Sequence, residues 1–253
     1  MEGGRFRLAY LILVLAILVA AGMLGYYSFR SAREHAALGE QTIAASLLSV
    51  AQQRVEQIER YVRIADNTVF RLVDPNDPGS VTTRWLPEAT TQTPSVRAVL
   101  LTDESGNVIQ WATTLEKRAR KPFLRVFRQD LVPLLELDAA NASSLQHAHE
   151  TIGDHTYLIS YRGWRTLTGE LSYVVAYHDP EYLVGEVFSA SFTADESTPL
   201  YNVVDESNQI IFGPDLTEAG VYTVDHRFPT TLNNWRLQVA PRQAALLQAQ
   251  GRS

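Results

Sequence analysis

The feature that most restricts the fold is an uncharged, apolar run between Arg7 and Arg30. The run extends from Leu8 to Phe29, and a helix needs about 20 such residues to cross the roughly 30 Å of hydrocarbon in a bilayer. Tyrosines stand at both of its ends, as in the aromatic belts of membrane proteins. The sequence therefore predicts a transmembrane helix over residues 8–29.

A cleaved signal peptide is the competing interpretation. The apolar core of such a peptide has about 7–15 residues and precedes a small-x-small site. Ala20-Ala21-Gly22 matches that site only loosely, and the apolar run is longer than such a core. We therefore expect a membrane anchor. Arg5 and Arg7 favour a cytoplasmic position for residues 1–7, although arginines at the far end of the run weaken this charge signal.

The segment after this run predicts a long stalk helix over residues 30–73. From residue 31 to residue 73 there is no proline, and apolar or small residues recur every three or four positions. This spacing is typical of an amphipathic helix with a coiled-coil-like seam. The prolines of Asp74-Pro75-Asn76-Asp77-Pro78-Gly79 cannot continue the helix. Two interpretations of the seam remain open: it packs on the chain's own domain, or it pairs with a second copy of the chain. Both can hold, with the membrane-near half of the helix pairing and the far half packing.

The rest of the chain predicts mixed α and β structure. Two segments are near-copies, Asp103-Glu104-Ser105-Gly106-Asn107-Val108-Ile109 and Asp205-Glu206-Ser207-Asn208-Gln209-Ile210-Ile211. In each, turn-favouring residues connect two apolar segments, which predicts a strand–turn–strand unit. The repeat favours two similar small antiparallel sheets over one barrel. The predicted strands are 96–101, 108–111, 155–161, 171–177, 201–204, 210–213, 221–228 and 235–239.

Two helices are predicted between these strands. One spans residues 122–131, with Pro133 breaking or kinking it. The other begins after Asp179, which we expect to cap it, with Pro180 as its first helical residue.

Composition excludes several function classes. The formal net charge is −6, and an acidic surface repels phosphate backbones, so we expect no nucleic-acid binding. The chain has no cysteine, which excludes disulfides, thiolate catalysis and cysteine-ligated metals. The sequence contains no nucleophile elbow, Gly-rich phosphate loop or HExxH motif, so we expect no catalysis by this chain and no cofactor.

A family resemblance rests on the stretch Gly169-Glu170-Leu171-Ser172-Tyr173-Val174-Val175-Ala176-Tyr177-His178-Asp179-Pro180-Glu181-Tyr182-Leu183. It is similar to the crossing from the last distal strand into the linking helix in the double Cache (PAS-like) sensor region of bacterial sensor histidine kinases, chemoreceptors and diguanylate cyclases. Trp235-Arg236-Leu237-Gln238-Val239-Ala240-Pro241 resembles the last strand of that region. The likeness covers nearly the whole chain.

The resemblance implies an α+β fold with two PAS-like antiparallel sheets in tandem after the transmembrane and stalk helices. We expect a membrane-distal domain over residues 74–190 and a smaller membrane-proximal domain over residues 191–240. A helical tail over residues 241–253 completes the expected organisation.

The resemblance also implies a location and a function. The bulk of the chain is expected in the periplasm or outside the cell, held by a single pass through the bacterial inner membrane. A small-molecule ligand in the distal sheet and a homodimer through the long helix are implied. The implied function is ligand-sensing input for transmembrane signalling, with a two-component sensor histidine kinase as the leading receptor class and chemoreceptors or diguanylate cyclases as alternatives. The competing hypotheses are a membrane-tethered binding or scaffold protein without its own output, and an anchored envelope enzyme.

Two departures from the family pattern bear on these expectations. Family members re-enter the membrane after the proximal sheet and carry a cytoplasmic output module, whereas this sequence shows no second apolar run and no kinase or cyclase motif. A kinase module is expected only if the gene product continues past residue 253. Amino-acid-binding relatives place an aspartate where this chain has Tyr177, so the carboxylate that would bind an amine is missing there.

Five residues are the candidates for ligand binding. They combine an arginine, which pairs with carboxylates, and aromatic side chains, which form the walls of small-ligand sites. Ordinary strand packing is the alternative interpretation of the same residues. The candidates are Tyr161, Arg162, Trp164, Tyr173 and Tyr177.

Histidines form the only metal-like group in the sequence. His147 and His149 are two residues apart, a spacing that puts both imidazoles on one face wherever the backbone is a strand, and His155 follows shortly after. Exposed histidines of a loop and a strand are the favoured interpretation, and we predict no metal site.

Overall fold

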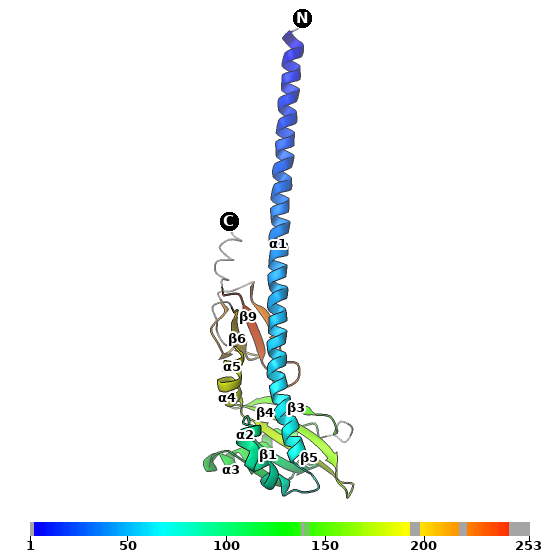
Figure 1. Ribbon diagram of the computed structural model, residues 1–253, viewed down its shortest axis with the longest axis vertical. Coiled ribbons are helices and arrows are strands. Elements are labelled where there is room, and N and C mark those ends of the chain that lie inside the picture. The colour runs from blue at the N-terminus through cyan, green and yellow to red at the C-terminus, as the bar shows by residue number, and fades with distance from the viewer. Residues whose placement is uncertain (1–2, 138–139, 141, 193–197, 218–221, 243–253) are drawn as a thin grey trace.

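The computed structural model describes residues 3–137, 140, 142–192, 198–217 and 222–242 of the chain, without the side chains of residues 3–18 and 32–40. The fold is α+β, with one long N-terminal helix and two antiparallel sheets (Figure 1). This is the predicted arrangement. The predicted helical tail lies, apart from residues 241 and 242, outside the described residues.

The long helix α1 (Gly3–Leu72) contains 70 residues, which corresponds to a length of about 105 Å at 1.5 Å per residue. It ends at Leu72, three residues before Pro75 and one residue before the predicted end, and the Val73 N–H still donates to the Val69 carbonyl. Among the described residues, no helix combines the length and apolar character needed to cross a membrane. The side chains of residues 8–18, within the predicted span, lie outside the described residues.

The larger sheet has five strands in the order β2-β1-β5-β4-β3, all antiparallel. It lies at the end of α1, far from the N-terminus, and we call it the distal sheet (Figure 1). Its strands are β1 (Val96–Asp103), β2 (Val108–Thr113), β3 (Gln146–Ile152), β4 (His155–Arg165) and β5 (Leu171–His178). Strand β3 is absent from the predicted strands because it contains few apolar residues.

One face of the distal sheet packs on α1, and we call it the stalk face. Val99, Leu101, Val174 and Ala176 lie there, fully buried against the last turns of α1. The π-helical turn η1 (Val81–Trp85) and helix α2 (Leu86–Gln92) cover the rest of this face.

The opposite face packs on α3 (Lys117–Val126), and we call it the α3 face. The π-helical segment η2 (Phe127–Leu131) and the 3-10 turn η3 (Val132–Leu134) continue α3. This helix begins five residues before the predicted start, and Pro122 lies inside it. Burial of Phe123 and Phe127, worth roughly 1.5–3 kcal/mol each, outweighs the one hydrogen bond that a proline removes.

The smaller sheet has the order β7-β6-β9-β8 and lies beside the middle of α1, so we call it the proximal sheet (Figure 1). Its strands are β6 (Leu200–Val204), β7 (Ile210–Phe212), β8 (Val224–Arg227) and β9 (Arg236–Ala240). Trp235, next to β9, is 3% exposed. Its core also contains Val55, Ile58 and Val62 of α1.

A helical segment links the two sheets. It consists of α4 (Pro180–Tyr182), the π-helical η4 (Leu183–Phe188) and α5 (Ser189–Ser191). Asp179 caps it as predicted, because its Oδ1 accepts a hydrogen bond from the Glu181 N–H at 3.0 Å.

The two near-copies of the sequence fold into the same turn. Asp103 Oδ1 accepts hydrogen bonds from the backbone N–H groups of Ser105 and Asn107, at 2.9 and 2.8 Å. Asp205 Oδ1 likewise accepts hydrogen bonds from the backbone N–H groups of Ser207 and Gln209, both at 2.8 Å. The fourth turn residue has positive φ in each, Gly106 at 78° and Asn208 at 63°. Glycine and asparagine are the residues that tolerate this conformation.

Candidate functional site

The five predicted ligand-binding residues lie on two different faces of the distal sheet. Tyr161, Tyr173 and Tyr177 are buried on the α3 face. Arg162 and Trp164 alternate with them along the chain and therefore face α1. The Arg162 guanidinium lies 5.0 Å from the Trp164 ring centre, a cation–π contact. Strand alternation thus prevents the five side chains from lining one pocket.

The α3 face carries a group of stacked aromatic rings around Tyr177. The rings of Tyr177 and Phe123 stack with centres 4.9 Å apart, and the Tyr157 ring lies 5.8 Å from Tyr177. His155 Nε2 lies 3.1 Å from the Tyr177 hydroxyl. Burial, followed by the charge of Asp179, raises the pKa of Tyr177 above its ordinary value. The hydroxyl is therefore neutral and able to donate a hydrogen bond.

A cleft of about 300 Å³ opens at this aromatic group, between α3, the sheet and the start of α4. We call it the aromatic cleft. Asp179 lies at the cleft and is held in place by its cap bond and by Arg97, whose Nε donates to Asp179 Oδ2 at 2.8 Å. The lining residues are Leu115, Ala119, Pro122, Phe123, Val126, His155, Tyr157, Tyr177, Asp179 and Glu181.

On the stalk face, a buried carboxylate joins α1 to two strands. Asp66 of α1 is fully buried, and its two oxygens lie 2.8 Å from His178 Nε2 and 2.9 Å from His147 Nε2. Burial alone raises the pKa of Asp66, but the two imidazoles outweigh it and lower the pKa to about 2. Asp66 is therefore a charged acceptor for β3 and β5 together.

Ser95 extends this group, because its hydroxyl lies 3.2 Å from His178 Nδ1. The serine–histidine–aspartate connectivity is that of a hydrolytic triad. However, Ser95, His178 and Asp66 are each 0% exposed, so a substrate has no access to the hydroxyl. The group is a structural connection between helix and sheet.

The histidines expected to be exposed are in part buried, which corrects that prediction. The His147 side chain is 6% exposed in its contact with Asp66, and His149 is 1% exposed. Their strand pairs with β4 on one edge only, but helix α1 and the proximal sheet cover its face. Within the described part of the chain, no group of three or more acidic or histidine side chains is placed to hold a metal.

A second buried carboxylate joins α1 to the proximal sheet. Glu59 is 2% exposed and accepts hydrogen bonds from the Thr230 and Thr231 N–H groups, at 2.8 and 3.0 Å. The Thr230 hydroxyl adds a third bond at 2.6 Å. Sequence reasoning missed both carboxylates. Their signal was the spacing of Glu59 and Asp66, seven residues apart and beside the apolar seam.

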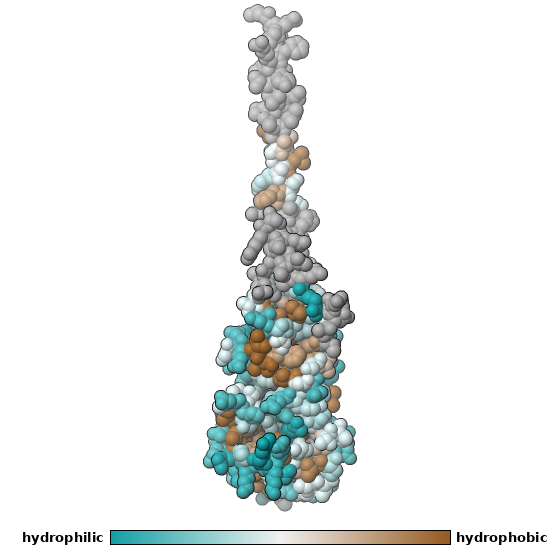
Figure 2. All heavy atoms as spheres, turned by 90° about the vertical axis from the view of Figure 1, so that its left-hand side faces the viewer, coloured by the Kyte–Doolittle hydropathy of each residue, from teal (hydrophilic) through white to brown (hydrophobic). Residues whose placement is uncertain are grey.

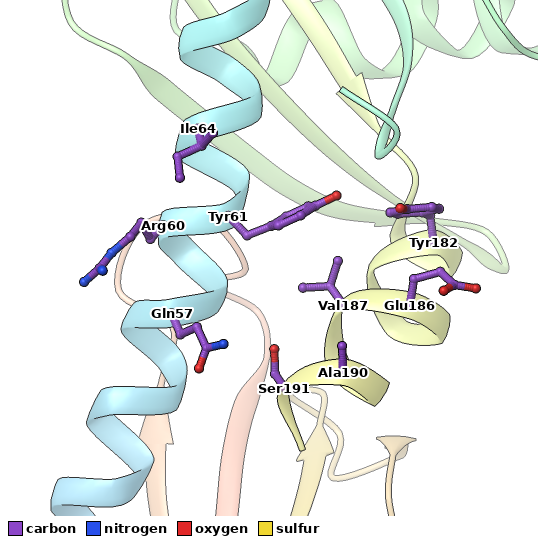
Figure 3. A pocket seen from close by; sticks show the side chains of 9 residues that line it. All are labelled: Gln57, Arg60, Tyr61, Ile64, Tyr182, Glu186, Val187, Ala190 and Ser191. Atoms are coloured by element: carbon purple, nitrogen blue, oxygen red, sulfur yellow. The ribbon is translucent and has the colours of Figure 1, made fainter. Parts of the chain in front are cut away.

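A groove of about 460 Å³ separates α1 from the linking segment (Figure 3). Figure 3 shows the Tyr61 ring pointing from α1 toward Tyr182, across this groove. Burial, followed by interaction with Tyr182, raises the pKa of Tyr61 to about 12.

Comparison with known proteins gives no match to a family model and none to a curated protein. Similar solved structures include an extracellular ligand binding receptor from Desulfohalobium retbaense, with 12% identity and a TM-score of 0.46. The match covers 78% of this chain and 40% of that receptor, so the chain spans well under half of its length.

Two other similar structures are matched over nearly their whole length. The ligand-binding domain of the Pseudomonas aeruginosa amino acid chemoreceptor PctC, in complex with GABA, has 12% identity and a TM-score of 0.42. The match covers 76% of this chain and 96% of that domain. The extracellular domain of the histidine kinase vpHK1S-Z8 has 13% identity and a TM-score of 0.44, with 81% and 98% covered.

Proposed function

We propose that this chain is the extracytoplasmic ligand-sensing input region of a membrane-anchored receptor, with a two-component sensor histidine kinase as the receptor class. The observation that carries the proposal is a pair of adjacent residues on β5. Tyr177 lines the aromatic cleft, and His178, on the other face, contacts Asp66 of α1. A displacement of β5 by a ligand therefore acts directly on the stalk helix.

The aromatic cleft fits a small ligand with a flat apolar part. The rings of Phe123 and Tyr177 offer a stacking surface, while His155, the Tyr177 hydroxyl and Glu181 supply hydrogen-bonding groups. The volume of about 300 Å³ is at the lower end of the range for small-molecule sites. We therefore assign the ligand site to this cleft, with Tyr177 as the predicted residue that belongs to it.

Transmission requires two arrangements of α1 that the ligand binds with different affinity. Coupling free energies between sites are typically about 1–3 kcal/mol. Hydrogen bonds to charged groups contribute about 1.5–3 kcal/mol. A shift of β5 that weakens the bonds from Asp66 to β3 and β5 can therefore supply a coupling free energy of this size.

Exposed apolar side chains on α1 support a membrane anchor near the N-terminus. In the described part of the predicted span, six large side chains are between 52% and 68% exposed, and Figure 2 shows apolar residues among them on the bare stalk. Such surface is unfavourable in water and favourable in lipid. The six are Val19, Met23, Leu24, Tyr26, Tyr27 and Phe29.

A homodimer through α1 is the other part of the proposal. Leu48 of α1 remains 38% exposed, one position after the buried Leu47. A parallel partner helix on the side of Leu48 would cover that side chain and would give both copies a common signalling axis.

The test is a thermal-shift screen of the full chain against small aromatic acids, aromatic amines and aliphatic carboxylates, followed by calorimetric titration of each hit. We expect Tyr177→Phe, which removes one hydroxyl and keeps the ring, to weaken a hit about fivefold, since a hydrogen bond contributes about 1 kcal/mol.

Arg162→Ala is the matched control, because Arg162 lies on the other face of the same sheet. Unchanged affinity in this variant is expected. Affinity lost in Arg162→Ala and retained in Tyr177→Phe would move the ligand to the stalk face and overturn the assignment. A screen without any saturable hit would count against ligand sensing itself.

A further inference from the structure

The proximal sheet also has a face that is turned away from α1. Tyr201 and Val203 of β6 pack in the core against α1, so the alternating Asn202 faces the other side. There, a pocket of about 380 Å³ is lined by polar groups from β6, β9 and the segment after β7. The aromatic cleft lies on the corresponding face of the distal sheet, the one away from α1.

Asn202 is the residue that gives this pocket its chemistry. Its side chain is 1% exposed, and its Nδ2 donates to the Pro214 carbonyl at 2.8 Å. This bond fixes the orientation of the amide, because a flipped amide would bring two acceptors together. Asn202 lines the pocket, and its Oδ1 is a buried acceptor that has no hydrogen-bond partner among the described residues.

Buried acceptors in folded proteins are nearly always hydrogen-bonded, because an unsatisfied one is destabilising. Thr223, on the same pocket, also has a buried hydroxyl oxygen without a partner among the described residues. An amide oxygen can only accept and a hydroxyl can also accept, so a molecule that supplies hydrogen-bond donors would satisfy both atoms.

The charge of the residues that line the pocket restricts the chemical class of that molecule. Asp215 lines the pocket, and hydrogen bonds from the Thr217 hydroxyl and N–H lower the pKa of Asp215, so it carries a negative charge at neutral pH. Gln238 contributes a further amide, and none of the described side chains that line the pocket is cationic. The guanidinium of Arg236, on the same face of β9, is paired with Asn208 and Asp225. An anion is therefore disfavoured, and an ammonium group combines the required donors with the complementary charge.

We propose that this pocket is a second binding site of the chain, for a small primary amine whose ammonium group donates hydrogen bonds to Asn202 and Asp215. The site goes beyond the proposed sensing function, because it is separate from the aromatic cleft and lies on the other sheet.

Calorimetric titration of the full chain with ethanolamine tests the proposal, with glycerol and acetate as neutral and anionic comparators. We expect saturable binding of ethanolamine, weaker binding of glycerol and none of acetate. Asp215→Asn, a change on an exposed side chain, is expected to weaken ethanolamine binding about tenfold, as the loss of one charge-assisted hydrogen bond does. Asn202→Leu, checked for folding by circular dichroism, is expected to abolish binding.

Two controls separate this site from other effects. Glu206→Gln changes an exposed turn residue outside the pocket, and Tyr177→Phe changes the aromatic cleft, so both are expected to bind ethanolamine normally. Absence of saturable binding up to about 10 mM, beyond the millimolar range of weak specific complexes, overturns the proposal. Equal binding of acetate, or binding that Asp215→Asn leaves unchanged, overturns it as well. Ethanolamine binding lost in Tyr177→Phe would place the amine in the distal cleft instead.

Discussion

At the scale of single residues, His149 shows how one imidazole connects the two sheets. Its Nδ1 accepts a hydrogen bond from the Asn234 N–H at 3.2 Å, and its ring meets the edge of Trp235 with centres 4.8 Å apart. Since Nδ1 accepts, the proton of the neutral ring is on Nε2, which is buried. Protonation at Nδ1 would break this bond, because the new ring N–H and the Asn234 N–H would then be two donors that face each other. Burial accordingly lowers the pKa of His149 to about 4.

The pH dependence of stability follows from this shift. In the unfolded chain His149 takes up a proton near its ordinary pKa of 6.5, whereas in the folded chain it does so only near 4. Between these values the unfolded state binds more protons, so lowering the pH destabilises the fold. We expect His149 to contribute a loss of about 2 kcal/mol between pH 7 and pH 5, measured by urea denaturation.

His149→Gln is the comparison variant, because glutamine can accept from the Asn234 N–H and does not titrate. Its free energy of unfolding is expected to fall less over the same pH interval than that of the unchanged chain. The carboxylate of Asp66 does not interfere, since it titrates below this window, near pH 2. Equal pH dependence of both proteins would contradict the assignment.

At the scale of elements, α1 is fixed to each sheet by one buried carboxylate. Glu59 and Asp66 are seven residues apart, two turns on one side of the helix. The first bonds the segment before β9 and the second bonds β3 and β5. The rotation of α1 about its axis is therefore set at two levels, and a sheet can move relative to α1 only by breaking one of these groups of hydrogen bonds.

Removal of each carboxylate should loosen only its own sheet. We expect Glu59→Ala and Asp66→Asn each to lower the free energy of unfolding by about 3 kcal/mol, since buried partners of a charge are left unsatisfied. Hydrogen exchange should accelerate at Thr230 and Thr231 in the first variant, and in β3 and β5 in the second.

The matched control for both is Glu56→Ala on the same helix. The Glu56 side chain is 64% exposed and pairs with Arg60, so its removal should change stability by less than about 1 kcal/mol. Faster exchange in both sheets after either single change would show that the two connections are not separate.

At the scale of the whole molecule, α1 is the one element that contacts both sheets and also extends toward the N-terminus (Figure 1). Any signal that leaves the globular part toward a membrane anchor passes along this helix. The proposed dimer would place two such helices side by side.

Cysteine scanning tests that arrangement, because the chain has no cysteine of its own. Single cysteines at the exposed positions 44, 45, 46, 48 and 49 should form disulfide-linked dimers with a helical periodicity, strongest on the face of Leu48. Leu47→Cys, at a buried position, should remain monomeric on a non-reducing gel. Uniformly absent cross-links in the membrane-bound chain would contradict a dimer through α1.

The sequence predicted the local elements well. Proline at residue 75 ends α1, Asp179 caps the linking segment, and the two Asp-Glu-Ser turns form the same hydrogen bonds. Each of these depends on neighbours within a few residues. Strand β3 escaped prediction because its side chains are mostly polar and its place at the sheet edge is given by pairing with β4.

The candidate site was predicted only in part. The apolar and aromatic character of β4 and β5 identified Tyr177, which lines the aromatic cleft. The same pattern grouped Arg162 with the tyrosines, although strand alternation directs it to the stalk face. Proximity in sequence was thus taken for proximity in space.

The sequence by itself determined the long helix, the repeated strand–turn–strand unit and the points at which elements begin and end, because these depend on the short periods of helix and strand. Only the tertiary structure decided which polar side chains meet. Asp66 contacts histidines 81 and 112 residues further along the chain, and Glu59 contacts threonines more than 170 residues away. Such contacts depend on strand order and register, which the local pattern of residues does not contain.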